Sequence, residues 1–127
     1  MTEHGAGVTV RAKDALGAYG EELAASHLQA AGMVILERNW RCPTGEIDIV
    51  ARDGRVLVIC EVKTRTTNDF GAPLEAVTAR KAARLRRLAA AWLHDRQVQV
   101  PEIRIDLVGV LRPRSGPTEL EHVRGVA

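Results

Sequence analysis

A short Asp53-Gly54 segment between two apolar, β-branched runs constrains the centre of this chain more than any other feature. The runs cover residues 46–51 and 56–62, and Asp-Gly between such runs is a strong signal for a β-hairpin. A tight two-residue turn needs residues that tolerate a positive φ angle, as Gly and Asp do. We therefore predict two antiparallel strands joined by a two-residue loop at Asp53 and Gly54.

Side-chain alternation in this hairpin sorts charged and apolar residues onto opposite sides of the sheet. Asp48 and Glu61 become diagonal neighbours, roughly 7–8 Å apart at Cα, and a three-residue loop would reverse this parity. The predicted pairs are Arg52 with Arg55, Val50 with Leu57, Asp48 with Ile59, and Glu46 with Glu61. The charged side carries Glu46, Asp48, Glu61 and Lys63. The apolar side, expected to face the core, carries Ile47, Ile49, Val56, Val58, Cys60 and Val62.

Two carboxylates and an amine at one strand edge suit metal-assisted hydrolysis of a phosphodiester. The reaction needs a more acidic attacking water and a partner for the negative charge that builds on phosphorus. Mg²⁺ held by one or two carboxylates supplies both. In this interpretation Asp48 and Glu61 hold the metal, and Lys63 stabilises charge or orients the water. The same residues also fit a solvated strand end whose charges neutralise one another, and both interpretations stay open here.

Length and composition favour one domain outside the membrane. A chain of 127 residues is long enough for one compact core and too short for two. We expect a flexible lead-in over residues 1–13 and a single domain over residues 14–127. No segment approaches the ~20 apolar residues of a membrane span, and the N-terminus lacks the apolar run of a signal peptide. Cys42 and Cys60 have no ligand-like spacing, so we expect a cytoplasmic protein with no membrane partner.

Hydrophobic periodicity and turn residues predict the element order α-β-β-β-α-β. The first helix is predicted from Asp14 to Ala31, and the second from a start between Pro73 and Thr78 to an end near His94. A short edge strand is a further option after Pro113. The predicted strands cover residues 33–42, 46–51, 56–65 and 102–111.

Charged residues on the two predicted helices add to the candidate site. At about 100° per residue, Glu21 falls on the border of the first helix's apolar stripe and can reach the sheet edge. Lys81 lies inside the apolar stripe of the second helix, where its amine either snorkels to solvent or extends toward the carboxylates. Arg80, Arg84 and Arg87 share an adjacent face, which is either suited to phosphate contacts or simply solvated.

The charge of the chain is uneven, although its net charge is only +2. Residues 1–78 hold eight Lys and Arg against eleven Asp and Glu, whereas residues 79–114 hold nine against three. An acidic site beside a basic segment is what a nuclease requires, because carboxylates bind metal and guanidinium groups bind backbone phosphates.

Several short motifs, each weak alone, are specific in combination. They are Gly17-x-x-Gly20-Glu21-x-x-Ala24, Asn39-Trp40-Arg41, Gly45-Glu46-Ile47-Asp48, Glu61-Val62-Lys63-Thr64-Arg65 and Lys81. Over roughly residues 14–111 the chain thereby resembles the YraN-like family of small bacterial proteins, which are similar to Holliday-junction resolvases. The resemblance implies the PD-(D/E)XK nuclease superfamily and an α/β, restriction-endonuclease-like fold with a mixed four-stranded sheet flanked by helices.

The resemblance also implies roles for individual residues. Glu21 would be the acidic catalytic residue on the helix, Asp48 and Glu61 the ligands of Mg²⁺ or Mn²⁺, and Lys63 the catalytic lysine. Glu46 matches a family position with a supporting role, and Ile47 replaces the proline of the superfamily name. The residues expected to contact nucleic acid are Arg65, Arg80, Lys81, Arg84 and Arg87.

Three functions compete at this point. The first is a divalent-metal-dependent nuclease acting on DNA, including branched or damaged DNA. The second is a nucleic-acid-binding module that keeps the fold without cutting, and the third is a protein-interaction domain. The intact carboxylate–lysine set favours the first, whereas the low net charge keeps the other two open. A domain this small offers one site, so cutting both strands would require a homodimer or two encounters.

Overall fold

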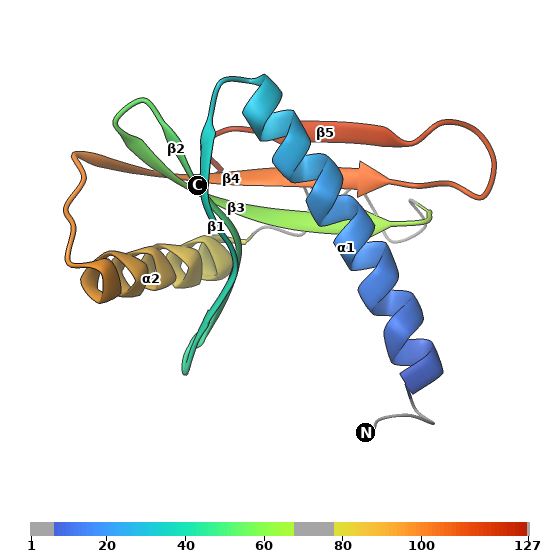
Figure 1. The fold of residues 1–127 in the computed structure, drawn as a ribbon, viewed down its shortest axis with the longest axis horizontal. Helices are drawn as coiled ribbons and strands as arrows, with labels where there is room; N and C mark the ends of the chain where they lie inside the picture. Colours follow the sequence, from blue (N-terminus) through green and yellow to red (C-terminus); the bar gives the residue numbers. More distant parts are fainter. Residues whose placement is uncertain (1–6, 68–77, 127) are drawn as a thin grey trace.

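A five-stranded mixed sheet forms the centre of the fold (Figure 1). The structure is a computed structural model and describes residues 7–67 and 78–126. The sheet order is β1-β2-β3-β4-β5, and every neighbouring pair is antiparallel except β3 and β4, which run parallel on either side of the α2 crossover. The elements are α1 (Gly7–Ala30), β1 (Val34–Cys42), β2 (Gly45–Asp53), β3 (Val56–Arg65), α2 (Ala79–Arg96), β4 (Glu102–Leu111) and β5 (Glu119–Val123).

Each face of the sheet carries its own apolar core. α1 covers the first face, where the main buried residues are Ala24, Leu28, Ile49, Val58, Cys60, Val108 and Val110. α2 covers the second, where they are Ile47, Val50, Leu57, Ile59, Leu85, Leu88, Trp92 and Ile105. These apolar side chains leave water on both sides of the central strands, which is the main force that holds the sheet and helices together.

Ile47 lies in the α2-side core, so its predicted place beside Ile49 on the other face is wrong. The reason is that β2 leaves β3 at this point. The β2–β3 pairing extends only from Ile49 to Asp53, whereas β2 pairs with β1 along nearly all its length. Just beyond the end of that pairing, the Asp48 carboxylate accepts a hydrogen bond from the Val62 N–H at 2.8 Å.

The hairpin loop has the predicted length but not the predicted position. Asp53 pairs with Val56, so the loop residues are Gly54 and Arg55, and the register is shifted by two residues. Val50 pairs with Ile59 rather than with Leu57. Gly54, with φ at 63°, takes the first loop position, which a type II′ turn reserves for glycine. A shift of two residues preserves parity, so Asp48, Glu61 and Lys63 still share one side of the hairpin.

The helices and the sheet edge differ from expectation in extent. α1 begins at Gly7, seven residues before the predicted start at Asp14, within the segment expected to be a lead-in. α2 begins after Thr78, whose hydroxyl accepts the Lys81 N–H as an N-cap; alternative starts at residues 73–77 lie outside the described residues. The α/β class is confirmed, but the count of four strands is wrong, because the optional edge strand after Pro113 is present as β5. Neither described helix combines the length and apolar character needed to cross a membrane.

Candidate functional site

Four charged residues from three elements meet where β3 approaches its carboxyl end. Asp48 on β2 and Glu61 on β3 directly follow Ile49–Cys60, the last pair of the β2–β3 ladder, and this register is not the one that would make them diagonal neighbours. Glu61 Oε2 lies 2.5 Å from Lys81 Nζ of α2 and 3.5 Å from Lys63 Nζ. The Glu61 side chain is only 12% exposed, so these amines neutralise a largely buried charge. The structure thus places Lys81 in the carboxylate cluster.

Asp48 sits in surroundings that disfavour its charged form. Burial is the largest cause, and it raises the pKa of Asp48 from its ordinary 3.8 to about 6, together with the negative charges of Glu61, Glu21 and Glu46. The Val62 N–H bond works in the opposite direction but does not offset them. A carboxylate in this situation would gain from a nearby cation.

Lys63 is shifted in the opposite sense. Burial lowers the pKa of the Lys63 amine, and the neighbouring Lys81 lowers it further, while Glu61 opposes the shift. A lysine with a lowered pKa exchanges protons more readily near neutral pH than an ordinary amine. Lys63 is therefore suited to handling a proton of an attacking water.

Two carboxylates suit the expected Mg²⁺ or Mn²⁺. Mg²⁺ is commonly held by one or two carboxylates, with waters and substrate phosphate completing its ligands. Within the described residues, no group of three or more His, Cys, Asp or Glu side chains is arranged to hold a metal ion. Asp48 and Glu61 would therefore supply only two ligands to such an ion and leave its other positions to water and substrate. A cation on Glu61 would replace part of its ion pairing with Lys63 and Lys81.

The other predicted site residues lie around this cluster. Glu21 of α1 is half-buried and acts on Asp48 through its charge. Glu46 is exposed and faces Arg41 at 3.6 Å. Arg65 ends β3, and its buried Nε has no hydrogen-bond partner among the described residues. Three exposed arginines of α2 also belong to the predicted set: Arg80, Arg84 and Arg87.

A buried ionic network that the sequence did not reveal lies on the α1 side of the sheet. Asp106 has no exposed surface and accepts a bidentate pair of bonds from Arg104, at 2.8 and 3.0 Å. His122 Nε2 lies 2.9 Å and the Gly125 N–H 3.1 Å from the same carboxylate. His122 also contacts His27 of α1 at 3.1 Å. The sequence signal for this network was the alternation of Arg104, Asp106 and Val108 opposite Ile103, Ile105 and Leu107.

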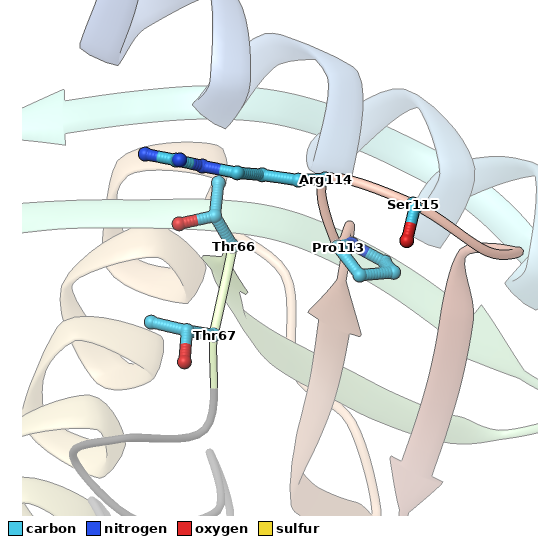
Figure 2. Close-up of a pocket in the computed structure, with 5 residues that line it drawn as sticks. All are labelled: Thr66, Thr67, Pro113, Arg114 and Ser115. Atoms are coloured by element: carbon cyan, nitrogen blue, oxygen red, sulfur yellow. The ribbon is translucent and has the colours of Figure 1, made fainter.

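A pocket of about 430 Å³ lies at the carboxyl ends of β3 and β4 (Figure 2). The sequence did not predict the residues that line this pocket as site residues, because these residues follow the strands in segments of loop-like composition. The signal that could have found them is a run of hydroxyl side chains after β3, at the edge where a second parallel strand also ends. The lining residues are Thr66, Thr67, Pro113, Arg114 and Ser115.

The sequence profile of Uncharacterised protein family UPF0102 matches residues 20–110. The chain belongs to UPF0102. A UPF0102 protein of Nocardioides sp. is 65% identical over 114 residues, which cover 90% of this chain and 92% of that protein. A UPF0102 protein of Beutenbergia cavernae is 59% identical over 117 residues, which cover 92% of this chain and 99% of that protein. A UPF0102 protein of Streptomyces coelicolor is 58% identical over 125 residues, which cover 97% of this chain and 96% of that protein. The part matched by the UPF0102 profile contains the whole carboxylate–lysine cluster, whereas β5 lies beyond it.

Proposed function

We propose that this UPF0102 chain is a divalent-metal-dependent nuclease that hydrolyses DNA phosphodiester bonds, including those of branched or damaged DNA. The observation that carries the proposal is the convergence of Asp48, Glu61 and Lys63 at one sheet edge. A salt bridge built only for stability would not require a buried carboxylate whose pKa is raised to about 6. The likeness to PD-(D/E)XK nucleases and to a restriction-endonuclease-like fold supports the same proposal.

Each residue of the cluster has a task in this reaction. Asp48 and Glu61 would hold Mg²⁺ or Mn²⁺, which supplies a Lewis acid for the phosphate and a more acidic bound water. Lys63 would orient the attacking water, and the lowered pKa of its amine would help it to take up a proton from that water whenever the amine is deprotonated. Lys81 keeps Glu61 oriented through their close ion pair and would place its amine beside the phosphate. Glu21 adds to the negative charge that favours a cation at Asp48.

The test is cleavage of labelled branched, flapped, linear and single-stranded DNA with Mg²⁺, Mn²⁺ or EDTA. Glu61→Gln and Lys63→Met keep the approximate size of the side chains while removing their charge. We expect metal-dependent cutting by the wild type and a loss of roughly 10²-fold or more in both variants. Glu102→Gln is the matched control, since Glu102 is exposed at the opposite end of the sheet and should cut normally. Cutting that persists in EDTA, or in both site variants, would contradict the proposal.

The second candidate is a nucleic-acid-binding module that does not cut. It is favoured by the exposed arginines of α2, which offer phosphate contacts that do not depend on the cluster. In that case the wild type and Lys63→Met would bind DNA equally without cleavage. A protein-interaction domain would bind neither DNA nor RNA.

We propose a cytoplasmic setting, which suits the free thiols of Cys42 and Cys60.

The nuclease proposal also bears on assembly. One small domain carries one site, so cleavage of both strands requires either a homodimer or two successive encounters. Light scattering at the assay concentration separates these two routes, because a monomer that still cuts both strands excludes the homodimer.

A further inference from the structure

The pocket beyond the carboxylate cluster has the chemistry of an anion site. Thr66 and Thr67 directly follow β3, and Pro113, Arg114 and Ser115 lie at the start of the β4–β5 connection (Figure 2). The Arg114 side chain extends across Thr66, so a guanidinium group and hydroxyl groups border one hollow. None of these five described residues carries a carboxylate. A volume of about 430 Å³ leaves room for a phosphodiester group with water.

We propose that this pocket binds a backbone phosphate of the DNA strand a few nucleotides from the bond that is cut. The inference rests on the proposed nuclease function and names a second contact for the same substrate. β3 and β4 are parallel through the Arg65–Leu111 pair, so both end at the edge that carries Glu61 and Lys63. Ligands of sheets with parallel strands commonly bind at this carboxyl edge.

The spacing along β3 fits a neighbouring phosphate. Thr66 lies three positions after Lys63, which corresponds to about 10 Å of extended chain. B-form DNA advances about 3.4 Å per nucleotide along its axis, so the pocket lies about three nucleotides from the cluster. The cluster lies on the α2 side of the sheet and the pocket loop is anchored to α1, so a substrate strand that passes the end of β3 from one side to the other would bring a phosphate to Arg114.

The structure holds the loop of this pocket in place. The Arg112 N–H donates to the Arg65 carbonyl at 2.8 Å, and the Arg112 guanidinium lies 4.3 Å from the centre of the Tyr19 ring. The Tyr19 hydroxyl lies 2.8 Å from Thr118 Oγ1. Both ends of the segment that carries Arg114 are therefore anchored, one to β3 and the other to α1. A site held before binding loses less conformational entropy when its ligand arrives.

Nearby charge favours an anionic occupant over a neutral one. Arg65, Arg112 and Arg114 all lie at this end of β3 and β4, and the buried Arg65 Nε has no partner among the described residues. Glu119 lies opposite Leu111 on β5, but its side chain is exposed to water, which screens its charge. No aromatic ring is among the lining residues for stacking on a base, so recognition is directed to the phosphate.

The test measures DNA binding in EDTA, so that it does not depend on cleavage. A labelled duplex is titrated with the full chain, with Arg114→Gln and with the control Arg55→Gln, at several salt concentrations. Arg55 is exposed in the hairpin loop at the opposite end of the sheet. We expect Arg114→Gln to weaken binding about tenfold and to reduce the slope of log K against log salt by about 1, with Arg55→Gln unchanged.

Further measurements keep the outcomes distinct. Thr66→Val should weaken binding without changing the salt slope, because it removes a hydroxyl and no charge. Equal slopes of log K against log salt for Arg114→Gln and Arg55→Gln would overturn the inference. Inorganic phosphate that binds through Arg114 while DNA binding stays unchanged would overturn it too and assign the pocket to small anions. Binding that depends on Arg114 without any cleavage in Mg²⁺ would support the phosphate site and contradict only the nuclease proposal.

Discussion

Asp48 is a residue whose position costs stability. Its carboxylate accepts the Val62 N–H and is largely withdrawn from water, while Glu61, Glu21 and Glu46 repel its charge. An asparagine oxygen could accept the same bond without carrying a charge. The destabilised anion therefore adds nothing to the fold that an amide could not supply. Strain of this kind at one residue is typical of a site that is completed by a ligand.

The first prediction at the residue scale is that Asp48→Asn stabilises the protein at pH 7.5. Because the pKa of Asp48 in the folded chain is about 6, above its ordinary 3.8, proton uptake stabilises the fold fully below pH 4, and this stabilisation is lost as pH rises through 6. The wild type should lose about 1–3 kcal/mol over that range relative to Asp48→Asn. Urea unfolding at pH 4.5 and 7.5 measures the difference.

Two comparisons complete that experiment. Asp95→Asn is the control, because Asp95 is exposed near the end of α2 and should leave the pH dependence unchanged. Mg²⁺ should raise the Tm of the wild type more than that of Asp48→Asn. Parallel stability curves for the wild type and Asp48→Asn between pH 4 and 7.5 would show that Asp48 titrates normally.

At the scale of elements, a single glycine sets how closely α1 approaches β3. Gly20 is buried, and a Cβ atom there would lie 1.8 Å from Thr64 Oγ1 and 2.9 Å from Thr64 Cβ. Any side chain would push the helix away from the strand. The next residue is Glu21, whose charge acts on Asp48. Close packing at Gly20 therefore also sets the distance of Glu21 from the candidate metal site.

The matching prediction compares two glycines of α1. Gly20→Ala should destabilise the protein by about 1–3 kcal/mol, because both the helix and Thr64 must shift. Gly17→Ala should stabilise it by about 0.5–1 kcal/mol, because a Cβ at Gly17 meets nothing within 4 Å and alanine favours a helix. Thermal unfolding of both variants measures the contrast. If both substitutions stabilised the protein, the close contact between α1 and β3 would be refuted.

Local patterns could predict the elements, but not every detail of their pairing. The bounds of β4 and the two-residue hairpin loop follow from alternation and turn composition. The position of that loop depends on Asp53, whose carboxylate binds Arg104 at 3.0 Å and keeps Asp53 in the strand. This partner lies 51 residues away in sequence, beyond the reach of a turn rule. The short edge strand offered as an option after Pro113 is present as β5, although its five residues alternate too briefly to fix the bounds of that strand.

The cluster and the pocket differ in how far the sequence could predict them. Asp48, Glu61 and Lys63 follow from hairpin parity, which survives a register shift of two residues. Lys81 could be placed on the buried stripe of its helix, but its pairing with Glu61 depends on how α2 crosses the sheet. The Arg114 pocket forms because the segments that follow β3 and β4 lie side by side, and no local periodicity encodes this arrangement.

At the scale of the whole molecule, the Asp106 network ties distant parts of the chain together. It reaches α1 through His27, β5 through His122, and the hairpin through Arg104 and Asp53. Burial alone would raise the pKa of Asp106, but the bonds from Arg104, His122 and Gly125 hold it below its ordinary range. Asp106 therefore stays charged and stabilises the fold, and this contribution is lost as pH falls below about 4.

We expect Asp106→Asn to destabilise the protein by about 3–5 kcal/mol at pH 7, because the substitution leaves buried cationic donors without their anion. Asp95→Asn should change stability by less than about 0.5 kcal/mol, since Asp95 is exposed. Urea unfolding measures both. The difference in the free energy of unfolding between the two variants should narrow as the pH approaches 3. A gap that did not change with pH would mean that Asp106 acts through packing rather than charge.

The segment that follows β5, which includes Gly125 of the network, has a practical consequence for handling the protein. The Val126 N–H bonds to the Ile105 carbonyl at 2.8 Å, and its side chain packs against the α2-side core. A fluorophore or purification tag joined directly after Ala127 would therefore be attached next to a segment that packs against the core and contacts Asp106. The start of α1 projects beyond the sheet in Figure 1 and offers a safer point of attachment. A gene shortened at residue 110, where the UPF0102 profile match ends, would lose the whole of β5 and expose Asp106.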